Sequence, residues 1–413
     1  MGSFPPVRLA YSTGARTVPG MLKRILPSVI SLGVFAALLA NPSTRTIAYV
    51  VVVLLTMVAI HEGGHLVAAR LSGVDAPEFS VGFGPEIVSF TPKSKKTKYA
   101  LRAIPLGGFV RISGLGVSSK LEGEDDPSRE AQGMSYEEVS RPKRVFISAA
   151  GPLANVLSAV LLMLVVFLQY GKIVPTLTVN TVPDMPAAIA GIKDGETITA
   201  VNGKSISSWD EIAPLVKESS DTATPLVVTL KDASGASHKV SLTPKGTESG
   251  PKVGISPVGT REDVSIFTAA SDAVGATKDI TVVTFKSFGS LGKSFVSLPA
   301  QLVGASTDKS ARVVSPIGAA HLAEESVKEA GWIGPVTLAA SVSVFLALFN
   351  LLPLPPLDGS HIATATYEGV FSRIRRREVR VNPDFTRRLA ALTTVSVLLM
   401  GVGALLLDVI RPL

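Results

Sequence analysis

Cysteine is absent from the 413-residue chain. No disulfide can therefore brace an external domain, and a metal site with thiolate ligands is excluded. Charge is also scarce, because Asp, Glu, Lys and Arg together make up 18% of the residues, whereas hydrophobic residues make up 46%. With a mean hydropathy of +0.39, this composition indicates a membrane protein rather than two or three soluble domains.

Histidine is rare as well, with five in the chain, and two of these are His61 and His65. They enclose Glu62 in the sequence HEGGH, within a stretch from Thr46 to Ala69 that holds no other acidic, basic or imidazole side chain. Histidines four apart lie on one face of a helix, and in HExxH zinc sites they hold the metal while the glutamate is the general base. Because ionisable groups are costly inside a membrane span, the pattern predicts a functional site rather than a chance match.

The net charge of +7 does not indicate a nucleic-acid partner. Basic residues cluster beside apolar runs, at 141–144 and at 371–388. This distribution is typical of loops retained at a cytoplasmic face. No nucleic-acid-binding motif accompanies it. We therefore expect membrane lipid, and no nucleic acid, among the partners.

Apolar stretches long enough to cross a bilayer recur along the chain. The predicted transmembrane helices are 46–71, 144–171, 331–357 and 389–410. A further N-terminal transmembrane helix is predicted at 22–44, after a polar cytoplasmic tail at 1–21, although basic residues before an apolar stretch also fit a secretory signal. Both interpretations place residues 41–47 outside the cell, so the topology is the same for either. We favour the retained helix.

Between the spans, residues 76–113 are rich in glycine and in strand-forming residues, which predicts a membrane-associated β-region. A cytoplasmic loop follows at 114–143. An extracytoplasmic linker at 261–330 carries apolar residues at helical spacing, which predicts an amphipathic helix. Those residues are Phe285, Phe288, Leu291, Phe295 and Leu298. A cytoplasmic Arg-rich segment at 358–388 precedes the last span.

Residues 172–260 differ from their surroundings and predict one inserted α+β domain outside the cytoplasm. Asn202-Gly203 is a tight-turn signal, and Ser208 with Glu211 forms a capping box that predicts a short helix through Lys217. The segments PLVVTL and HKVSLTP predict a hairpin. The predicted fold class is therefore an α-helical multi-pass membrane protein with four core transmembrane helices, an additional N-terminal one, a membrane-associated β-region and this domain.

An HExxH motif supplies two metal ligands, whereas a catalytic zinc usually takes three from the protein. Asp358 is the strongest candidate for the third, because it follows a proline-broken helix end on the same side of the membrane as HEGGH. His361 is a rival ligand or a neighbour of the site. In this topology His321 and His238 lie on the outer side of the membrane and cannot reach the metal site formed by HEGGH.

The expected chemistry is peptide hydrolysis, with Glu62 taking a proton from the attacking water and returning it to the leaving amine. Gly63 and Gly64 would let another helix or a substrate backbone approach closely, although packing alone would explain them equally well. Two other classes of function fit the same residues. One is a metal transporter that carries ions on intramembrane ionisable groups, and the other is a catalytically idle scaffold.

The motifs HEGGH and NLLPLPPLDG (Asn350–Gly359) together resemble those of the site-2 protease family of intramembrane zinc metalloproteases. The closest resemblance is to the bacterial regulated-intramembrane-proteolysis group, which carries a PDZ domain. It implies one zinc per chain, held by His61, His65 and Asp358, with Glu62 as the catalytic base. It also implies that Asn155, in AAGPLAN, and Asn350 handle the substrate.

In this family the β-region is thought to hold an unwound substrate by strand addition. VGFGP and IPLGGFV resemble that region, which implies substrate-binding roles for Gly82, Gly84, Gly107 and Gly108. The segment PAAIAGIKDGETITAVNGK resembles a bacterial PDZ domain, which would bind peptide carboxyl termini.

The resemblance implies a multi-pass protein of the bacterial plasma membrane, with the PDZ domain outside and the zinc site toward the cytoplasm. Its substrates would be single-pass membrane proteins that another protease has already cut on the outside. Anti-sigma factors and remnant signal peptides are the implied examples.

Overall fold

The computed structural model describes residues 29–30, 33–41, 44–92, 97–115, 134–247, 250–289, 297, 301 and 315–410. The chain separates into two compact units. The first comprises Met1–Val165 together with Asp272–Leu413, and the second is Val166–Ser271. We call them the membrane unit and the inserted unit.

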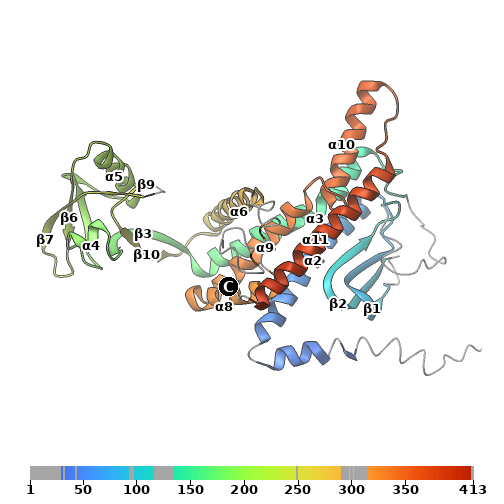
Figure 1. The fold of residues 1–413 in the computed structure, drawn as a ribbon, viewed down its shortest axis with the longest axis horizontal. Helices are drawn as coiled ribbons and strands as arrows, with labels where there is room; N and C mark the ends of the chain where they lie inside the picture. The colour runs from blue at the N-terminus through green and yellow to red at the C-terminus, as the bar shows by residue number, and fades with distance from the viewer. Residues whose placement is uncertain are drawn as a thin grey trace, which may run out of the picture. The chain divides into compact units, whose positions relative to one another are not determined.

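Within the described residues, four helices are long and apolar enough to cross a membrane (Figure 1). They are α2 (Arg45–Ser72), α3 (Arg141–Tyr170), α9 (Ile333–Asn350) and α11 (Pro383–Ile410). The predicted four-helix membrane core is therefore confirmed. Residues 33–40 of the predicted N-terminal helix are helical but are not among these four. Whether 22–44 crosses the membrane remains a prediction, and the tail at 1–21 lies outside the described residues.

The third span ends earlier than the sequence predicts. Helix α9 stops at Asn350 instead of continuing to 357, because Pro353, Pro355 and Pro356 lack the N–H group that a helix needs. A new helix, α10, then begins at Asp358 and runs to Arg375. The first half of the predicted Arg-rich segment is therefore helical. Helix α11 begins at Pro383, six residues before the predicted start at 389. Proline is tolerated in the first turn of a helix, because the backbone N–H groups there have no partner within the helix.

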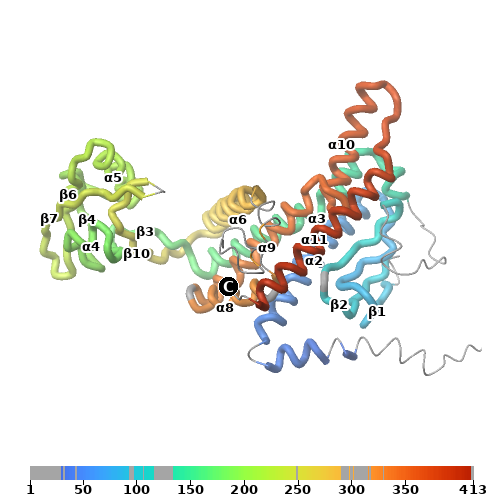
Figure 2. Tube along the Cα trace, viewed as in Figure 1, coloured from blue at the N-terminus to red at the C-terminus, as the bar shows by residue number. Residues whose placement is uncertain are grey.

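The predicted β-region consists of two long, bent strands that pair with each other, β1 (Glu78–Phe90) and β2 (Lys98–Arg111), and β2 also contacts α2 (Figure 2). The first part of β1, 78–81, pairs with 98–101 on one side and with 108–111 on the other, while 86–90 pairs with 99–102. The strands bend at Gly82, whose φ of +84° suits glycine. The segments 86–90 and 108–111 are thus left as the two edges of this sheet.

A buried ion cluster fixes the bend of the sheet. The Arg102 guanidinium bonds Glu78 at 2.6 Å and donates to the Ser80 hydroxyl and to the Gly84 carbonyl, both at 2.8 Å. Glu78 is only 4% exposed. A buried carboxylate needs such a partner, so Arg102 ties the central segment to the turn.

The inserted unit is built on a sheet in the order β10-β3-β4-β6-β7, with β5 paired to β4. Its strands are β3 (Lys172–Thr181), β4 (Thr197–Val201), β5 (Lys204–Ser205), β6 (Leu226–Lys231), β7 (Ser237–Leu242) and β10 (Ile255–Glu262), with a separate pair β8 (Lys245–Thr247) and β9 (Gly250–Lys252). Two helices, α4 (Pro186–Ile189) and α5 (Ile212–Asp221), accompany them. Val179, Ile198 and Leu230 lie in its buried core. The predicted α+β architecture is confirmed.

The turn, capping box and hairpin that the sequence predicts in this unit are also present. Asn202 and Gly203 both have positive φ, at 53° and 79°, as a tight hairpin turn requires. The capping box between Ser208 and Glu211 forms at a short 3₁₀ turn, Trp209–Glu211, that leads into α5. Strands β6 and β7 form the predicted hairpin.

The described part of the predicted linker includes the helices α6 (Ile266–Phe288) and α8 (Pro316–Ala330). Phe285 and Phe288 belong to α6, so the predicted helix is present there. Leu291, Phe295 and Leu298 lie outside the described residues. Helix α8, which the sequence analysis did not predict, packs against α2 and α9.

Candidate metal centre

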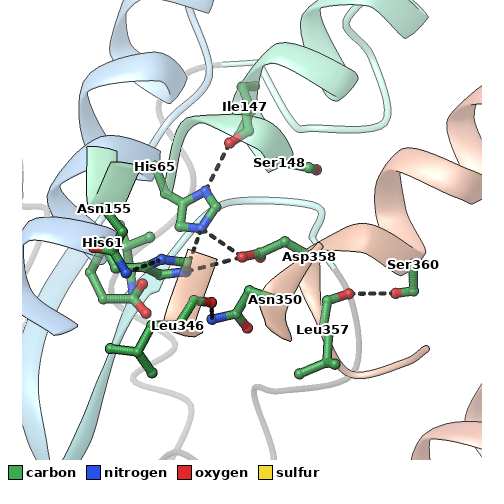
Figure 3. A network of polar contacts seen from close by, with 12 residues as sticks. His61, His65, Ile147, Ser148, Asn155, Leu346, Asn350, Leu357, Asp358 and Ser360 are labelled. Atoms are coloured by element: carbon green, nitrogen blue, oxygen red, sulfur yellow. Dashed lines mark hydrogen bonds and ion pairs between the residues drawn. The ribbon is translucent and has the colours of Figure 1, made fainter. Parts of the chain in front are cut away.

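His61 and His65 lie one turn apart on α2, and Asp358 is the first residue of α10 (Figure 3). Asp358 Oδ2 is 3.0 Å from His61 Nε2 and 3.2 Å from His65 Nε2, and the two Nε2 atoms are 3.3 Å apart. Both histidines are buried, at 7% and 5% exposure. Three predicted ligands, of which Asp358 is 297 positions from His61, therefore meet at one point.

This donor set fits zinc. Its three ligand atoms lie within 4.8 Å of one another, and they are two imidazole nitrogens and one carboxylate oxygen. Catalytic zinc sites use such nitrogen and oxygen donors from three residues and keep a fourth position open. Among the described residues, no other group of three histidine, cysteine or acidic side chains converges in this way.

The remaining histidines are not part of this group. The His361 ring packs edge-on against Tyr136, with 6.2 Å between ring centroids. His321 lies on α8. His238, in the inserted unit, is paired with Glu196 at 3.6 Å. Asp358, and not His361, is therefore the residue that lies in one group with His61 and His65.

The His65 ring is fixed by α3. Its Nδ1 lies 2.8 Å from the backbone carbonyl of Ile147, which can only accept (Figure 3). A Cβ added at Gly151 would lie 2.2 Å from His65 Nε2, and one added at Gly64 would lie 2.4 Å from the Ala150 carbonyl. Close approach of two helices therefore requires glycine at both positions. The prediction for Gly64 is confirmed in this sense, whereas Gly63 has no neighbour within 4 Å of its added Cβ.

Glu62 lies beside His61 in the chain but is held by the β-region. Its Oε2 accepts a hydrogen bond of 2.9 Å from the backbone N–H of Val110, on an edge segment of β2. The carboxylate is thus fixed between a helix and a strand edge.

The two asparagines predicted to handle substrate differ in their surroundings. Asn155, on α3, is 0% exposed, and its Nδ2 lies 3.4 Å from His61 Nδ1. Asn350 donates to the Leu346 carbonyl of its own helix at 3.1 Å (Figure 3). Asn155 therefore contacts a candidate ligand directly. Ile147 and Val110 could not be identified from the sequence, since both make their contacts through backbone groups. In the sequence, the small residues AAG before Pro152 were the feature that indicated a close contact between α3 and another helix, which the structure shows to be α2.

Comparison with known proteins agrees with this geometry. The profile of peptidase family M50 matches residues 49–389, which include His61, His65 and Asp358. The chain belongs to peptidase family M50. Family membership identifies this M50 peptidase as a zinc metalloprotease of the site-2 protease type. It favours that activity over the transporter and the idle scaffold.

Curated relatives cover most of the M50 chain. A protein of Agrobacterium fabrum named as a zinc metalloprotease is 30% identical over 341 residues, covering 78% of this chain and 86% of its own. The zinc metalloprotease Rip1 of Mycobacterium tuberculosis is 29% identical over 398 residues, covering 87% and 95%. With four apolar helices, the M50 peptidase is a multi-pass membrane protein.

Proposed function

We propose that this M50 peptidase is an intramembrane endopeptidase in which His61, His65 and Asp358 hold zinc and Glu62 is the base. The observation that carries this proposal is the meeting of two buried histidines of a span helix with the half-buried Asp358 at the start of α10, with Glu62 adjacent. Ionisable groups at membrane depth are rarely without a role.

When bound, zinc supplies the Lewis acidity that lets water attack a peptide carbonyl near neutral pH. Glu62 takes the proton of that water and returns it to the leaving amine. The Val110 N–H holds the carboxylate at its place on the strand edge. His65, fixed on the Ile147 carbonyl, keeps its Nε2 directed at the site.

Peptide bonds in a helix are engaged in hydrogen bonds and shielded, so a transmembrane substrate must unwind before it is cut. The edge segment 108–111 lies beside Glu62 and is the natural template for an extended chain. We therefore keep the β-region, with Gly82, Gly84, Gly107 and Gly108, as the proposed substrate-binding element. Packing also constrains three of these glycines. An added Cβ would lie 2.8 Å from the Arg102 and Ile104 carbonyls at Gly82, from the Phe83 ring at Gly107 and from the Ser80 carbonyl at Gly108.

The inserted unit is proposed to act as a PDZ domain. It contains a groove of about 640 Å³, lined by Trp209 of the 3₁₀ turn, by Ala213 and Val216 of α5, and by Val253 and Ile255. A groove between a helix and a strand suits a peptide carboxyl terminus. Such termini arise when another protease makes a first cut outside the membrane. The proposed substrates are therefore single-pass proteins already cut there, such as anti-sigma factors or remnant signal peptides.

The proposed location is the bacterial plasma membrane, with the inserted unit outside. Basic residues at 141–144 and 371–388 mark the cytoplasmic side. Arg141 donates to Ser372 at 3.2 Å, so these two basic segments meet in the structure. The zinc site would then open toward the cytoplasm.

The test uses purified full-length protein and a labelled transmembrane peptide. Wild type should cleave, chelator should stop cleavage, and Glu62→Gln should lower the rate by at least about 10²-fold, the usual contribution of a general base. Glu62→Gln should still bind zinc, because Glu62 is not a ligand in this site. Cleavage that continues unchanged in Glu62→Gln would refute the mechanism.

A further inference from the structure

Helix α3 contacts both imidazoles of the metal centre on the side away from the ligand atoms. Its Ile147 carbonyl faces His65 Nδ1, and two turns later its Asn155 amide faces His61 Nδ1. The two contacts differ in chemistry, because a carbonyl can only accept a hydrogen bond whereas an amide can accept or donate.

An imidazole that binds a metal through Nε2 carries its proton on Nδ1 and needs an acceptor there. The Ile147 carbonyl is such an acceptor for His65. His61 instead faces the Nδ2 donor of Asn155. If Nδ2 donates to Nδ1 in this orientation, the His61 proton must lie on Nε2, which is 3.0 Å from Asp358 Oδ2. That tautomer cannot bind a metal through Nε2.

The acceptor that His61 requires lies on the same side chain. Asn155 Oδ1 is buried and has no hydrogen-bond partner among the described residues. Turning the amide by 180° exchanges Oδ1 and Nδ2 within the same volume. The turn would direct Oδ1 at the Nδ1–H of His61 and would move Nδ2 to the buried position that Oδ1 now occupies.

The backbone of Asn155 is fixed by hydrogen bonds, so the side-chain amide can turn while the residue keeps its place. Its backbone carbonyl accepts hydrogen bonds from the Ser158 and Ser343 hydroxyls, each at 2.9 Å, and these hydroxyls lie 2.7 Å apart. Ser343 comes from α9, so two helices fix the position of the residue. Only the amide end remains to be oriented.

We propose that Asn155 is a positioning residue for the metal centre, which accepts the Nδ1 proton of His61 through Oδ1 and thereby selects the tautomer that binds zinc. The inference rests on the zinc site of the proposed function. It gives Asn155 a role in metal binding that needs no contact with substrate. The orientation of one amide then decides whether His61 donates to Asp358 or joins it as a ligand.

The test is zinc affinity of the purified full-length protein, measured by chelator competition without substrate. Asn155→Ala should lower the affinity by about 10- to 100-fold, as loss of a histidine's outer partner usually does. Asn155→Asp restores a pure acceptor and should return the affinity to the wild-type level or above. Ser158→Ala is the matched control, because it disrupts the same buried cluster without touching His61, and its affinity should be unchanged.

Thermal unfolding of the metal-free variants should show similar losses of stability for Asn155→Ala and Ser158→Ala. A readout that needs no variant is ¹⁵N NMR of the zinc-loaded wild type, which should place the His61 proton on Nδ1. A proton absent from Nδ1, wild-type affinity in Asn155→Ala, or Asn155→Asp as weak as Asn155→Ala would each overturn the inference alone. A wild type that binds no zinc would overturn the proposed function with it.

Discussion

At the scale of single residues, the reactive side chains are oriented by backbone groups of other elements. The carboxylate of Glu62 accepts from the Val110 N–H, and His65 faces the Ile147 carbonyl. Backbone partners cannot be removed by mutation of their own side chains. The orientation of these two groups therefore depends on how closely α2 approaches α3 and the β-region.

Because the orientation of His65 depends on the close approach of α2 and α3, one methyl group added at their contact should disturb it. Gly151→Ala would place a Cβ 2.2 Å from His65 Nε2, so the ring must move away from Ile147. We expect zinc affinity, measured by chelator competition, to fall by at least about 10-fold. The matched control is Gly63→Ala on α2, which meets nothing within 4 Å. It should keep zinc affinity and gain about 0.5–1 kcal/mol from helix propensity. Equal zinc affinity in both variants would contradict the steric argument.

The sequence was informative about these residues where side chains carried the signal. Histidines four apart share one helix face, and in HExxH sites the glutamate beside the first histidine is the base, so two proposed ligands and a proposed base followed from spacing. Asp358 was identified by the proline-broken helix end and by resemblance. Neither Val110 nor Ile147 could be predicted, because any residue supplies the same N–H or carbonyl. Their roles depend on which helices and strands meet.

At the scale of elements, the position of Asp358, the proposed third ligand, depends on the contacts that hold α10. Asp358 stands at the start of α10, and the far half of that helix is tied to α3. Arg144 lies 4.0 Å from Glu368, whose other oxygen accepts the Val381 N–H at 3.0 Å. Glu368 is thus shared between α3, α10 and the connection to α11, so it restrains the helix that carries Asp358.

Glu368→Ala should loosen α10. Loss of a largely buried hydrogen-bonding carboxylate costs about 1–3 kcal/mol, and here the cost falls on one helix. Hydrogen exchange should show faster exchange along α10, and zinc should dissociate faster. Glu378→Ala is the control, since Glu378 makes an exposed pair with Arg380 at 2.9 Å and such pairs contribute little. Unchanged exchange along α10 in Glu368→Ala would show that other contacts hold it.

Sequence patterns predicted long apolar elements better than short or polar ones. The four spans followed from apolar length, but α8 was missed, because PIGAAHLAEESVKEA carries four charged residues and only a small alanine face. Burial of Ala320 and Ala323, at 4% and 7%, comes from packing against other helices. The prolines after Asn350 indicated that α9 ends early. The predicted span was nevertheless extended to 357, because the apolar run continues through Leu357.

At the scale of the whole molecule, the chain joins a membrane unit that carries the metal centre to an inserted unit with its own core. Cleavage chemistry and peptide-end recognition are therefore proposed to reside in separately folded parts. Changes confined to one unit should leave the other's binding property intact.

This separation predicts that a change in the groove of the inserted unit weakens peptide binding without changing zinc affinity. Ala213 is exposed and lines the groove of the inserted unit, so Ala213→Glu should repel a peptide carboxylate and weaken its binding by several-fold. Trp209 lines the same groove and offers a fluorescence signal for titration. Zinc affinity should not change. Ser220→Glu, on the exposed side of the same helix, adds equal charge outside the groove and should bind peptide normally. Equal peptide binding in both variants would argue against this groove as the recognition site.

The distance between His61 and Asp358 along the chain also orders events during biosynthesis. A ribosome has made α2, α3 and the inserted unit before it reaches α10, and until then the centre has two of its three proposed ligands. If these three residues hold zinc as proposed, the chain is inactive until α10 has been made. A message truncated anywhere before residue 358 would yield an inert membrane protein rather than an unregulated protease.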